Sequence, residues 1–289
     1  MSNSKLPRDR KTRSARPHDD KDDAIAFDAD PDADPVPDPE YDAGQSVAIT
    51  EDHLIDALRT GDVSERGRLP YSSNHSFLVV VHHGTLDIPA VYKPQRGESP
   101  LWDFEWGTLC KRELAAFLVS RTLGWDLVPP TVLRTASHGL GSIQFYVDHD
   151  ADAHYFTIQS DARYAEALRR LTLFDAIINN ADRKSGHCLV GREQRLWAID
   201  HGLTFHTDYK VRTVLWEFSG EPVDRLLLDD LDDLRMQLVG RGSELTQELS
   251  ALLSDAERRA FLLRVQSLLR QGCFPAPIPQ RRNYPWPPV

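Results

Sequence analysis

The predicted secondary structure changes from strands to helices near residue 148. Between residues 46 and 147, short runs rich in β-branched residues predict strands, with helical spacing in only a few places. Beyond residue 148, apolar positions recur mostly at helical spacing. Strands followed mostly by helices predict an α+β chain of two lobes, the first small and mixed and the second mostly helical.

The first lobe is predicted to contain two helices and several strands. Thr50 offers a side-chain cap to the first helix, which has acidic residues in its first turn and Gly61 at its end. The turn at His82–Thr85 predicts a hairpin between two apolar strands. These elements are expected over residues 51–60, 76–95, 108–124, 131–135 and 141–148.

The second lobe is predicted to begin with a long amphipathic helix over residues 161–180, which Asn179 and Asn180 interrupt. Two short strands, further helical stretches and a Pro-rich segment that packs as extended chain are expected after it. They cover residues 188–191, 195–200, 226–239, 245–269 and 275–289.

Residues 1–45 have a basic first part and an acidic, Pro-rich second part. Such a segment has too little apolar surface to offset the entropy of ordering it, which predicts a disordered tail. The expected organisation is therefore a tail over residues 1–45, a first lobe over 46–147 and a second lobe over 148–289.

Composition narrows the classes of function. The formal net charge of −10 argues against nucleic-acid binding, which needs basic surface to neutralise phosphates. The sequence has no apolar run long enough to span a bilayer and no apolar core for a secretory signal near its N-terminus. Its three scattered cysteines suggest no disulfide framework, so a reduced, cytoplasmic location is expected.

Four charged residues match the requirements of phosphoryl transfer from ATP, which needs a cation on the phosphates, an acid to hold it, carboxylates for metal and a group for the acceptor hydroxyl. Lys93 ends an apolar strand, and Glu113 lies on the helix after it. Asp182 follows the long helix directly, and Asp200 lies between an apolar strand and Gly202. Taken singly, Lys93 and Glu113 would be ordinary surface positions; their combination with the two aspartates carries the hypothesis.

The segment from the long helix to Gly202 resembles a known family. Asp182-Arg183 just after a helix, then a short hairpin and a strand that ends Ile199-Asp200-x-Gly, is similar to the catalytic and metal-binding loops of phosphoinositide 3/4-kinase-like proteins and HipA-like bacterial kinases. The likeness covers roughly residues 68–206, and the chain also resembles an actinobacterial group of phosphoinositide-kinase-like proteins. It implies a two-lobed protein-kinase-like fold.

The resemblance also implies a role for each position. Asp182 would accept or orient the proton of the acceptor hydroxyl, with Arg183 as a second catalytic-loop residue, and Asp200 would bind metal. Lys93 would hold the phosphates of ATP, with Glu113 as its partner. The adenine would be held by the segment between the lobes, which comprises Gln144, Phe145, Tyr146 and Val147.

This sequence departs from the family pattern at two places. His187 stands where the family has an asparagine as a second metal ligand. A histidine ligand favours Mn²⁺ over Mg²⁺. It also predicts a loss of activity below about pH 6.5, where an ordinary histidine becomes protonated and no longer binds metal. No glycine-rich phosphate loop is present in the sequence. The turn that includes Ser72, Ser73 and Asn74 would take its place, or would be a plain polar turn.

The expected function is an ATP-dependent phosphotransferase of the phosphoinositide 3/4-kinase-like class that uses Mg²⁺ or Mn²⁺. A protein or small soluble acceptor is favoured over a lipid, because the acidic run at residues 226–234 gives the second lobe no basic amphipathic surface for anionic membranes. Two alternatives remain open. One is a nucleotide-binding pseudokinase that regulates a partner, and the other is a nucleotidyl transferase on the same fold.

Overall fold

The computed structural model describes residues 49–69, 74–240 and 242–289, all of which belong to one unit over Pro35–Val289. The predicted tail, residues 1–45, lies outside the described residues, and so do Ser72 and Ser73. Fourteen helices and strands of the described part position the candidate site. They are α1 Glu51–Thr60, β1 Asp62–Arg68, β2 Phe77–His83, β3 Leu86–Pro94, α2 Leu109–Thr122, β4 Thr131–Ala136, β5 Gly139–Phe145, α3 Tyr155–Ile158, α4 Ala165–Ile178, β6 Cys188–Val190, β7 Leu196–Ala198, α5 Arg225–Val239, α6 Glu244–Leu252 and α7 Asp255–Gln271.

The first five strands form one antiparallel sheet in the order β1-β2-β3-β5-β4. In β3, the alternate residues Ile88, Ala90 and Tyr92 are buried in the hydrophobic core. Because side chains alternate along a strand, Lys93 projects from the opposite face. The sheet therefore presents one apolar face to the core and holds Lys93 on the other.

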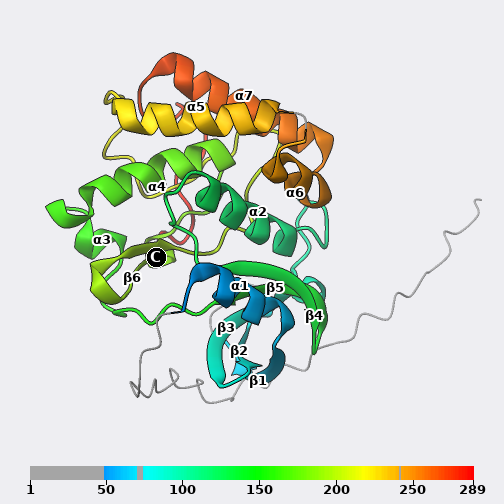
Figure 1. The fold of residues 1–289 in the computed structure, drawn as a ribbon. Helices are drawn as coiled ribbons and strands as arrows, with labels where there is room; N and C mark the ends of the chain where they lie inside the picture. Colours follow the sequence, from blue (N-terminus) through cyan, green and yellow to red (C-terminus); the bar gives the residue numbers. More distant parts are fainter. Residues whose placement is uncertain (1–48, 70–73, 241) are drawn as a thin grey trace, which may run out of the picture. The chain divides into compact units, whose positions relative to one another are not determined.

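The helix α2 lies against this sheet and contacts β4 and β5, as Figure 1 shows, and its other neighbour is α6. Ten of its fourteen residues are buried, among them the charged residues Arg112 and Glu113. A helix whose residues are buried around most of its circumference must be covered by other elements on several sides. The helix α2 therefore lies between the sheet and the helices that follow it in sequence.

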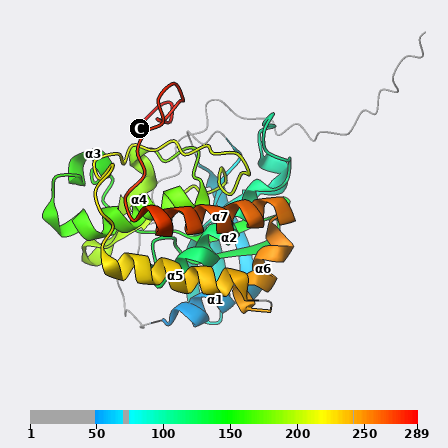
Figure 2. The ribbon, with the colours of Figure 1, turned by 90° about the horizontal axis from the view of Figure 1, so that it is seen from above.

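The C-terminal helices pack on α4. Helices α5 and α7 lie side by side, which Figure 2 shows from above, and α7 also contacts α4. The strands β6 and β7 form a separate two-stranded antiparallel hairpin after α4. The fold is thus the expected α+β arrangement, with a sheet-rich part first and a mostly helical part second.

Most predicted elements are confirmed, with differences at their ends. Thr50 accepts a hydrogen bond from the His53 backbone N–H, as expected of the cap of α1. The region 245–269 contains two helices, because Ser254 and Glu257 form a reciprocal capping box that starts α7. The strand β5 ends at Phe145, three residues before the predicted end. The last hydrogen bond to β3 is the one that Tyr146 N–H donates to Pro89 O.

Two elements of the structure were not predicted from the sequence. The sequence assigns no range to β1, which is polar along its length, and does not predict the single-turn helix α3. Within the described ranges, every helix is too short or too polar to cross a lipid bilayer.

Candidate functional site

The structure brings Lys93, Glu113 and Asp200 together. Lys93 Nζ lies 2.5 Å from Glu113 Oε1 and 3.1 Å from Asp200 Oδ1. The Glu113 side chain is only 3% exposed, whereas the Asp200 carboxylate is 47% exposed. A cation from β3 is therefore held by a buried acid on α2 and faces a second acid that solvent or a ligand can reach.

The charge state of this cluster follows from its contacts. Burial alone would lower the pKa of Lys93, but the carboxylates of Asp200 and Glu113 outweigh it, and the pKa is raised above its ordinary value. The ammonium of Lys93 is also the main reason that the pKa of Asp200 is well below its usual range, against the opposing effect of burial. Lysine and aspartate are thus both charged at neutral pH.

The backbone at Asp200 adopts an unusual conformation, with φ +62°. Positive φ is uncommon in a residue other than glycine, and the surrounding structure must hold it in place. Part of that support comes from the next residue, because His201 N–H donates to Glu113 Oε2 at 3.0 Å. Glu113 therefore binds both Lys93 and the backbone next to Asp200, and so fixes these two residues relative to each other.

Asp182 lies on the turn that follows α4. The helix ends at Asn179, which takes the left-handed conformation with φ 59° and ψ 49°, and Asn180 Oδ1 accepts a hydrogen bond from Asp182 N–H. Burial raises the pKa of Asp182, and the negative charge of Asp200 contributes in the same direction, while Lys184 opposes both. Asp182 is therefore near Asp200 in space, although the chain separates them by a hairpin.

Lys184 is a functional candidate that the sequence reasoning missed. Its Nζ lies 3.3 Å from Asp182 Oδ2, with both side chains about three-quarters buried. The signal in the sequence was a second cation two residues after the acid, in Asp182-Arg183-Lys184. This places a positive charge beside the candidate base.

Arg183 lies behind the site. Its side chain is 0% exposed and donates to both carboxylate oxygens of Asp175, at 2.9 and 3.0 Å. It also donates to the carbonyl of Ile199 and lies 2.7 Å from His201 Nε2. A catalytic role in contact with substrate does not fit this burial, so Arg183 is a positioning residue that ties α4 to the segment after β7.

His201 is buried as well, and its ring accepts the Arg183 hydrogen bond through Nε2, which leaves the proton on Nδ1. The Nδ1 atom is buried without a hydrogen-bond partner in the described part of the chain. Burial, with Arg183 and Lys93 nearby, holds the pKa of His201 well below its ordinary value. His201 is therefore neutral and fills the space between Phe174 and Arg183.

His187 lies beside Asp200, with Nε2 at 3.4 Å from Asp200 Oδ2. Lys184 N–H approaches the other ring nitrogen, Nδ1, at 3.4 Å. Burial lowers the pKa of His187 to about 4 against the opposing effect of Asp200, and the nearby Arg183 and Lys184 lower it further. The ring is therefore neutral at physiological pH, which is the state that binds metal.

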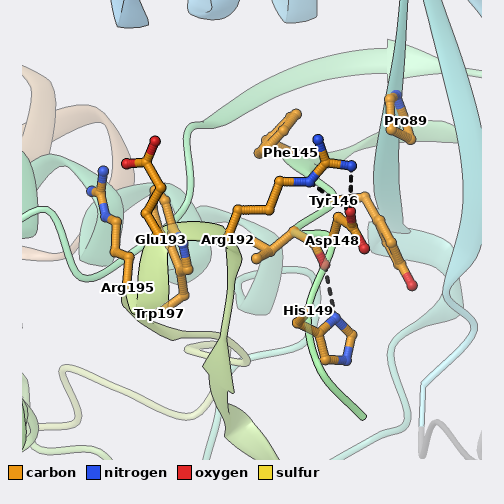
Figure 3. A pocket seen from close by; sticks show the side chains of 10 residues that line it. Pro89, Phe145, Tyr146, Asp148, His149, Arg192, Glu193, Arg195 and Trp197 are labelled. Atoms are coloured by element: carbon orange, nitrogen blue, oxygen red, sulfur yellow. Dashed lines mark hydrogen bonds and ion pairs between the residues drawn. The ribbon is translucent and has the colours of Figure 1, made fainter. Parts of the chain in front are cut away.

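The predicted adenine segment lines a cavity of about 280 Å³. Phe145 and Tyr146 lie on one side of it, and Trp197 of β7 on another (Figure 3), and Val147 also lines it. The ion pair between Arg192 and Asp148 lies across this cavity, as Figure 3 shows. Lys93 and Asp200 are not among its lining residues, so the cavity lies between the residues just after β5 and the β6–β7 hairpin and does not include the charged cluster.

The other predicted nucleotide-binding side chains in the described ranges, those of Gln144 and Asn74, form hydrogen bonds within the protein. Gln144 points its amide at Thr131 Oγ1, 2.8 Å away, and is buried in the sheet. Asn74 accepts a hydrogen bond from Ser99 N–H through Oδ1, at 2.8 Å. The structure therefore engages both side chains within the protein, and any nucleotide contact there would come from the backbone.

Comparisons with known proteins bear on the fold and the family. No family model matches the chain. Its fold resembles the crystal structure of the Golgi casein kinase with Mn/ADP bound, with TM-score 0.51, 17% identity, and coverage of 83% of this chain and 80% of that chain. The structure of hydra Fam20 with sugar is also similar, with TM-score 0.49, 14% identity, and coverage of 76% of this chain and 87% of that chain.

The first of these structures establishes a protein-kinase-like fold for the chain. The sequence is also 36% identical to Protein Rv2133c of Mycobacterium tuberculosis over 279 residues, which cover 85% of this chain and 98% of that protein. With a relative this similar over nearly its whole length, the chain belongs to the same family as Protein Rv2133c, and it has a protein-kinase-like fold.

Proposed function

We propose that this protein is an ATP-dependent phosphotransferase that uses a divalent metal. The observation that carries the proposal is the contact of Lys93 Nζ with both Glu113 and Asp200, at 2.5 and 3.1 Å. A buried acid holds the cation, and a half-exposed acid faces the same space. Phosphoryl transfer requires this combination of a fixed cation for phosphates and a carboxylate for metal.

In this proposal Lys93 binds the phosphates of ATP, and Glu113 orients it. ATP and metal would replace the Lys93–Asp200 contact, because the phosphates would bind the ammonium and the metal would bind the carboxylate. Adenine would bind along the segment Phe145–Val147, whose side chains line the neighbouring cavity. The aromatic side chains of Phe145, Tyr146 and Trp197 in that cavity suit a flat aromatic base.

Asp200 and His187 are the residues that would hold the metal, which would neutralise negative charge on the phosphates. Their fit rests on the half-exposed Asp200 carboxylate and on a neutral imidazole at 3.4 Å. A contact of 3.4 Å is longer than an ordinary hydrogen bond of about 2.7–3.2 Å, so neither group is strongly satisfied by the other. In the described ranges no three His, Cys, Asp or Glu side chains cluster as a metal site, so phosphates and water would supply the other ligands, as is common for Mg²⁺.

Asp182 would accept the proton of the acceptor hydroxyl, with Lys184 beside it to attract the transferred group. The raised pKa of Asp182 favours this role, because a stronger base takes a proton more readily. The motif around Asp182 and Asp200 leads us to propose the phosphoinositide 3/4-kinase-like class. We continue to favour a protein or small soluble acceptor over a bilayer lipid.

Incubation with γ-labelled and α-labelled ATP in parallel, with Mg²⁺ and with Mn²⁺, tests the proposal. We expect transfer of the γ label alone, and loss of transfer in Asp200→Asn but not in the control Asp229→Asn on the surface of α5. Transfer of the α label would mean nucleotidyl transfer. Metal-dependent ATP binding with no transfer of either label, for any acceptor supplied, would favour the pseudokinase alternative.

A further inference from the structure

A small pocket lies next to the turn that carries Asp182. It is lined by Tyr209–Arg212 and by Arg281–Asn283 of the C-terminal segment, and its volume is about 170 Å³. We call it the arginine pocket. Its two walls come from parts of the chain that are about 70 residues apart in sequence, and both are fastened to the turn that carries Asp182.

The first wall is fixed by backbone hydrogen bonds on both sides of Asp182. Arg212 N–H donates to Asn180 O at 3.0 Å, and Arg183 N–H donates to Arg212 O at 2.9 Å. Arg212 is close enough to lower the pKa of Asp182, against the larger effect of burial. The guanidinium of Arg212 therefore lies near the candidate base.

The second wall is fixed by the C-terminal segment. Asn283 O accepts hydrogen bonds from Thr213 N–H at 3.0 Å and from Trp216 Nε1–H at 3.1 Å. Further along, Pro288 O accepts from Ser185 N–H at 2.9 Å. The C-terminal segment thus crosses the surface between the segment 209–216 and the turn that follows Asp182, and it carries Arg281 and Arg282 with it.

The charges in the pocket are unbalanced. Lys210 is neutralised by Asp103, 2.7 Å away. Arg212, Arg281 and Arg282 form no ion pair with any acid in the described part of the chain. In the described part of the chain, the guanidinium of Arg281 donates only to Tyr209 O, and that of Arg282 only to Tyr284 O. Three guanidinium groups are thus gathered without an ion-pair partner among the described residues, in a protein whose net charge is −10.

We propose that the arginine pocket binds a phosphate group carried by the acceptor, an inference that rests on the proposed phosphotransferase function. Arginine presents a planar fork of N–H donors that matches phosphate oxygens, and several arginines around one cavity bind a doubly charged anion well. Since the pocket wall at Arg212 is hydrogen-bonded to the turn that carries Asp182, a bound phosphate would place a hydroxyl of the same molecule near the base. The acceptor is therefore a phosphomonoester that also carries a free hydroxyl.

The chemical step transfers the γ-phosphoryl group of ATP to the acceptor hydroxyl. The acceptor hydroxyl oxygen forms a bond to the γ-phosphorus of ATP, and the bond from that phosphorus to the β–γ bridging oxygen breaks. Asp182 takes the hydroxyl proton, and ADP leaves with the electron pair of the broken bond. The arginine pocket takes no part in bond breaking and serves only to hold the acceptor.

The test measures binding of glycerol 2-phosphate to the full chain by calorimetry, with glycerol as the uncharged comparison. Arg281→Gln/Arg282→Gln should weaken binding of glycerol 2-phosphate tenfold or more, and Arg281→Lys/Arg282→Lys, which keeps the charge but loses the planar fork, should bind with an affinity between wild type and the glutamine variant. The control Arg225→Gln/Arg270→Gln, which removes two exposed arginines elsewhere, should bind as wild type does. If the double glutamine variant fails to fold, Arg282→Gln alone is measured instead. This variant should fold, because the Arg282 side chain donates to a single backbone carbonyl, that of Tyr284.

Lys93→Ala separates this inference from the proposed function. Retained glycerol 2-phosphate binding in Lys93→Ala, with loss in the arginine variant, assigns the phosphate to the arginine pocket. If no label is transferred from ATP but this binding pattern holds, the phosphotransferase function fails and the binding site stands. Equal affinity in wild type and in Arg281→Gln/Arg282→Gln overturns the inference, whatever the ATP experiments show.

A second arm distinguishes the source of the phosphate. Vesicles of phosphatidylcholine with phosphatidic acid present a phosphomonoester on a lipid, and their sedimentation with the protein is measured for the same variants. Binding of glycerol 2-phosphate in solution supports a soluble acceptor. Arginine-dependent binding of the vesicles alone supports a lipid headgroup, and arginine-independent binding of both probes contradicts the proposal.

Discussion

Arg112 of α2 and Glu257 of α7 form a buried ion pair, with Arg112 Nη2 at 2.5 Å from Glu257 Oε1. Arg112 also donates to Thr204 O at 2.7 Å, so it contacts two parts of the helical lobe. The next residue on α2 is Glu113, the partner of Lys93. The ion pair therefore holds α2 on the C-terminal helices in the position that keeps Glu113 next to Lys93.

Arg112→Ala should destabilise the protein by about 3–5 kcal/mol, because it leaves the Glu257 carboxylate buried without its cation. The measurement is the free energy of unfolding from denaturant titration. The control is Arg121→Ala on the same helix, whose contacts with Glu51 and Asp52 are on the surface and should contribute about 1 kcal/mol or less. Equal losses in the two variants would show that the buried pair does not anchor α2.

The same pair predicts a pH dependence. Burial by itself raises the pKa of Glu257, but Arg112 and Ser254 outweigh it and the pKa is lowered. A carboxylate with a lowered pKa stabilises the folded state above its unfolded pKa, near 4.3, and that contribution is lost as the pH falls through the folded value. Wild type should lose this stability in acid, and Glu257→Gln should show a smaller loss over the same pH range in denaturant titrations.

The sequence was sufficient to predict the elements that carry a clear pattern. Apolar, β-branched runs on either side of a turn predicted β2 and β3, and helical spacing with Gly124 at the stop predicted α2, because local patterning specifies those structures. The break between α6 and α7 is also local, since Ser254 and Glu257 form a capping box, and it could have been read from the sequence. The polar strand β1 has no such pattern and is formed by pairing with β2.

The site could be predicted only in part. Lys93 was predicted from its place at the end of an apolar strand, Glu113 from the helix that follows, and Asp200 from the glycine two residues after it. The structure brings the two acids within hydrogen-bond distance of Lys93. The burial of Arg183 could not be predicted, because it depends on Asp175 of α4 and on the backbone beyond β7. The C-terminal segment next to Ser185 was also beyond prediction, since that contact joins residues about 100 positions apart.

His187 predicts a loss of stability in mild acid. Its pKa is about 4 when folded, below the ordinary 6.5, so the unfolded chain binds a proton between these values and the folded chain does not. Stability should therefore fall as the pH decreases from 6.5 towards 4, by roughly 2 kcal/mol between pH 7 and pH 5. Because the folded ring stays neutral to about pH 4, the acid loss of activity expected from the sequence near pH 6.5 should also move to that lower range.

His187→Asn should remove that part of the acid-dependent loss, because asparagine does not titrate. Denaturant titrations at pH 7 and pH 5 measure it, with His53→Asn on the exposed face of α1 as the control. An identical pH dependence in wild type and His187→Asn would show that the ring is not buried in its neutral form.

Asp182→Asn should lower kcat for γ-phosphoryl transfer by about 10²–10⁴-fold, which is the usual contribution of a general base. The affinity for ATP should change little, since Asp182 acts on the acceptor. In wild type the rate should fall in acid at a pH above the ordinary aspartate value, because burial raises the pKa of Asp182. Initial rates against pH measure both effects, and Asp152→Asn is a matched surface control; a wild-type rate in Asp182→Asn would exclude it as the base.

The affinity for ATP with and without divalent metal tests the account most directly. Calorimetry of the full chain should show tight binding with Mn²⁺ or Mg²⁺ and at least a hundredfold weaker binding in EDTA, a difference of about 2.7 kcal/mol. Asp200→Asn should remove the metal dependence and Lys93→Ala should weaken binding in either metal, while Lys111→Ala on α2 should bind as wild type does. Equal affinities with and without metal, or wild-type binding in Asp200→Asn, would contradict the assignment of this cluster as the nucleotide and metal site.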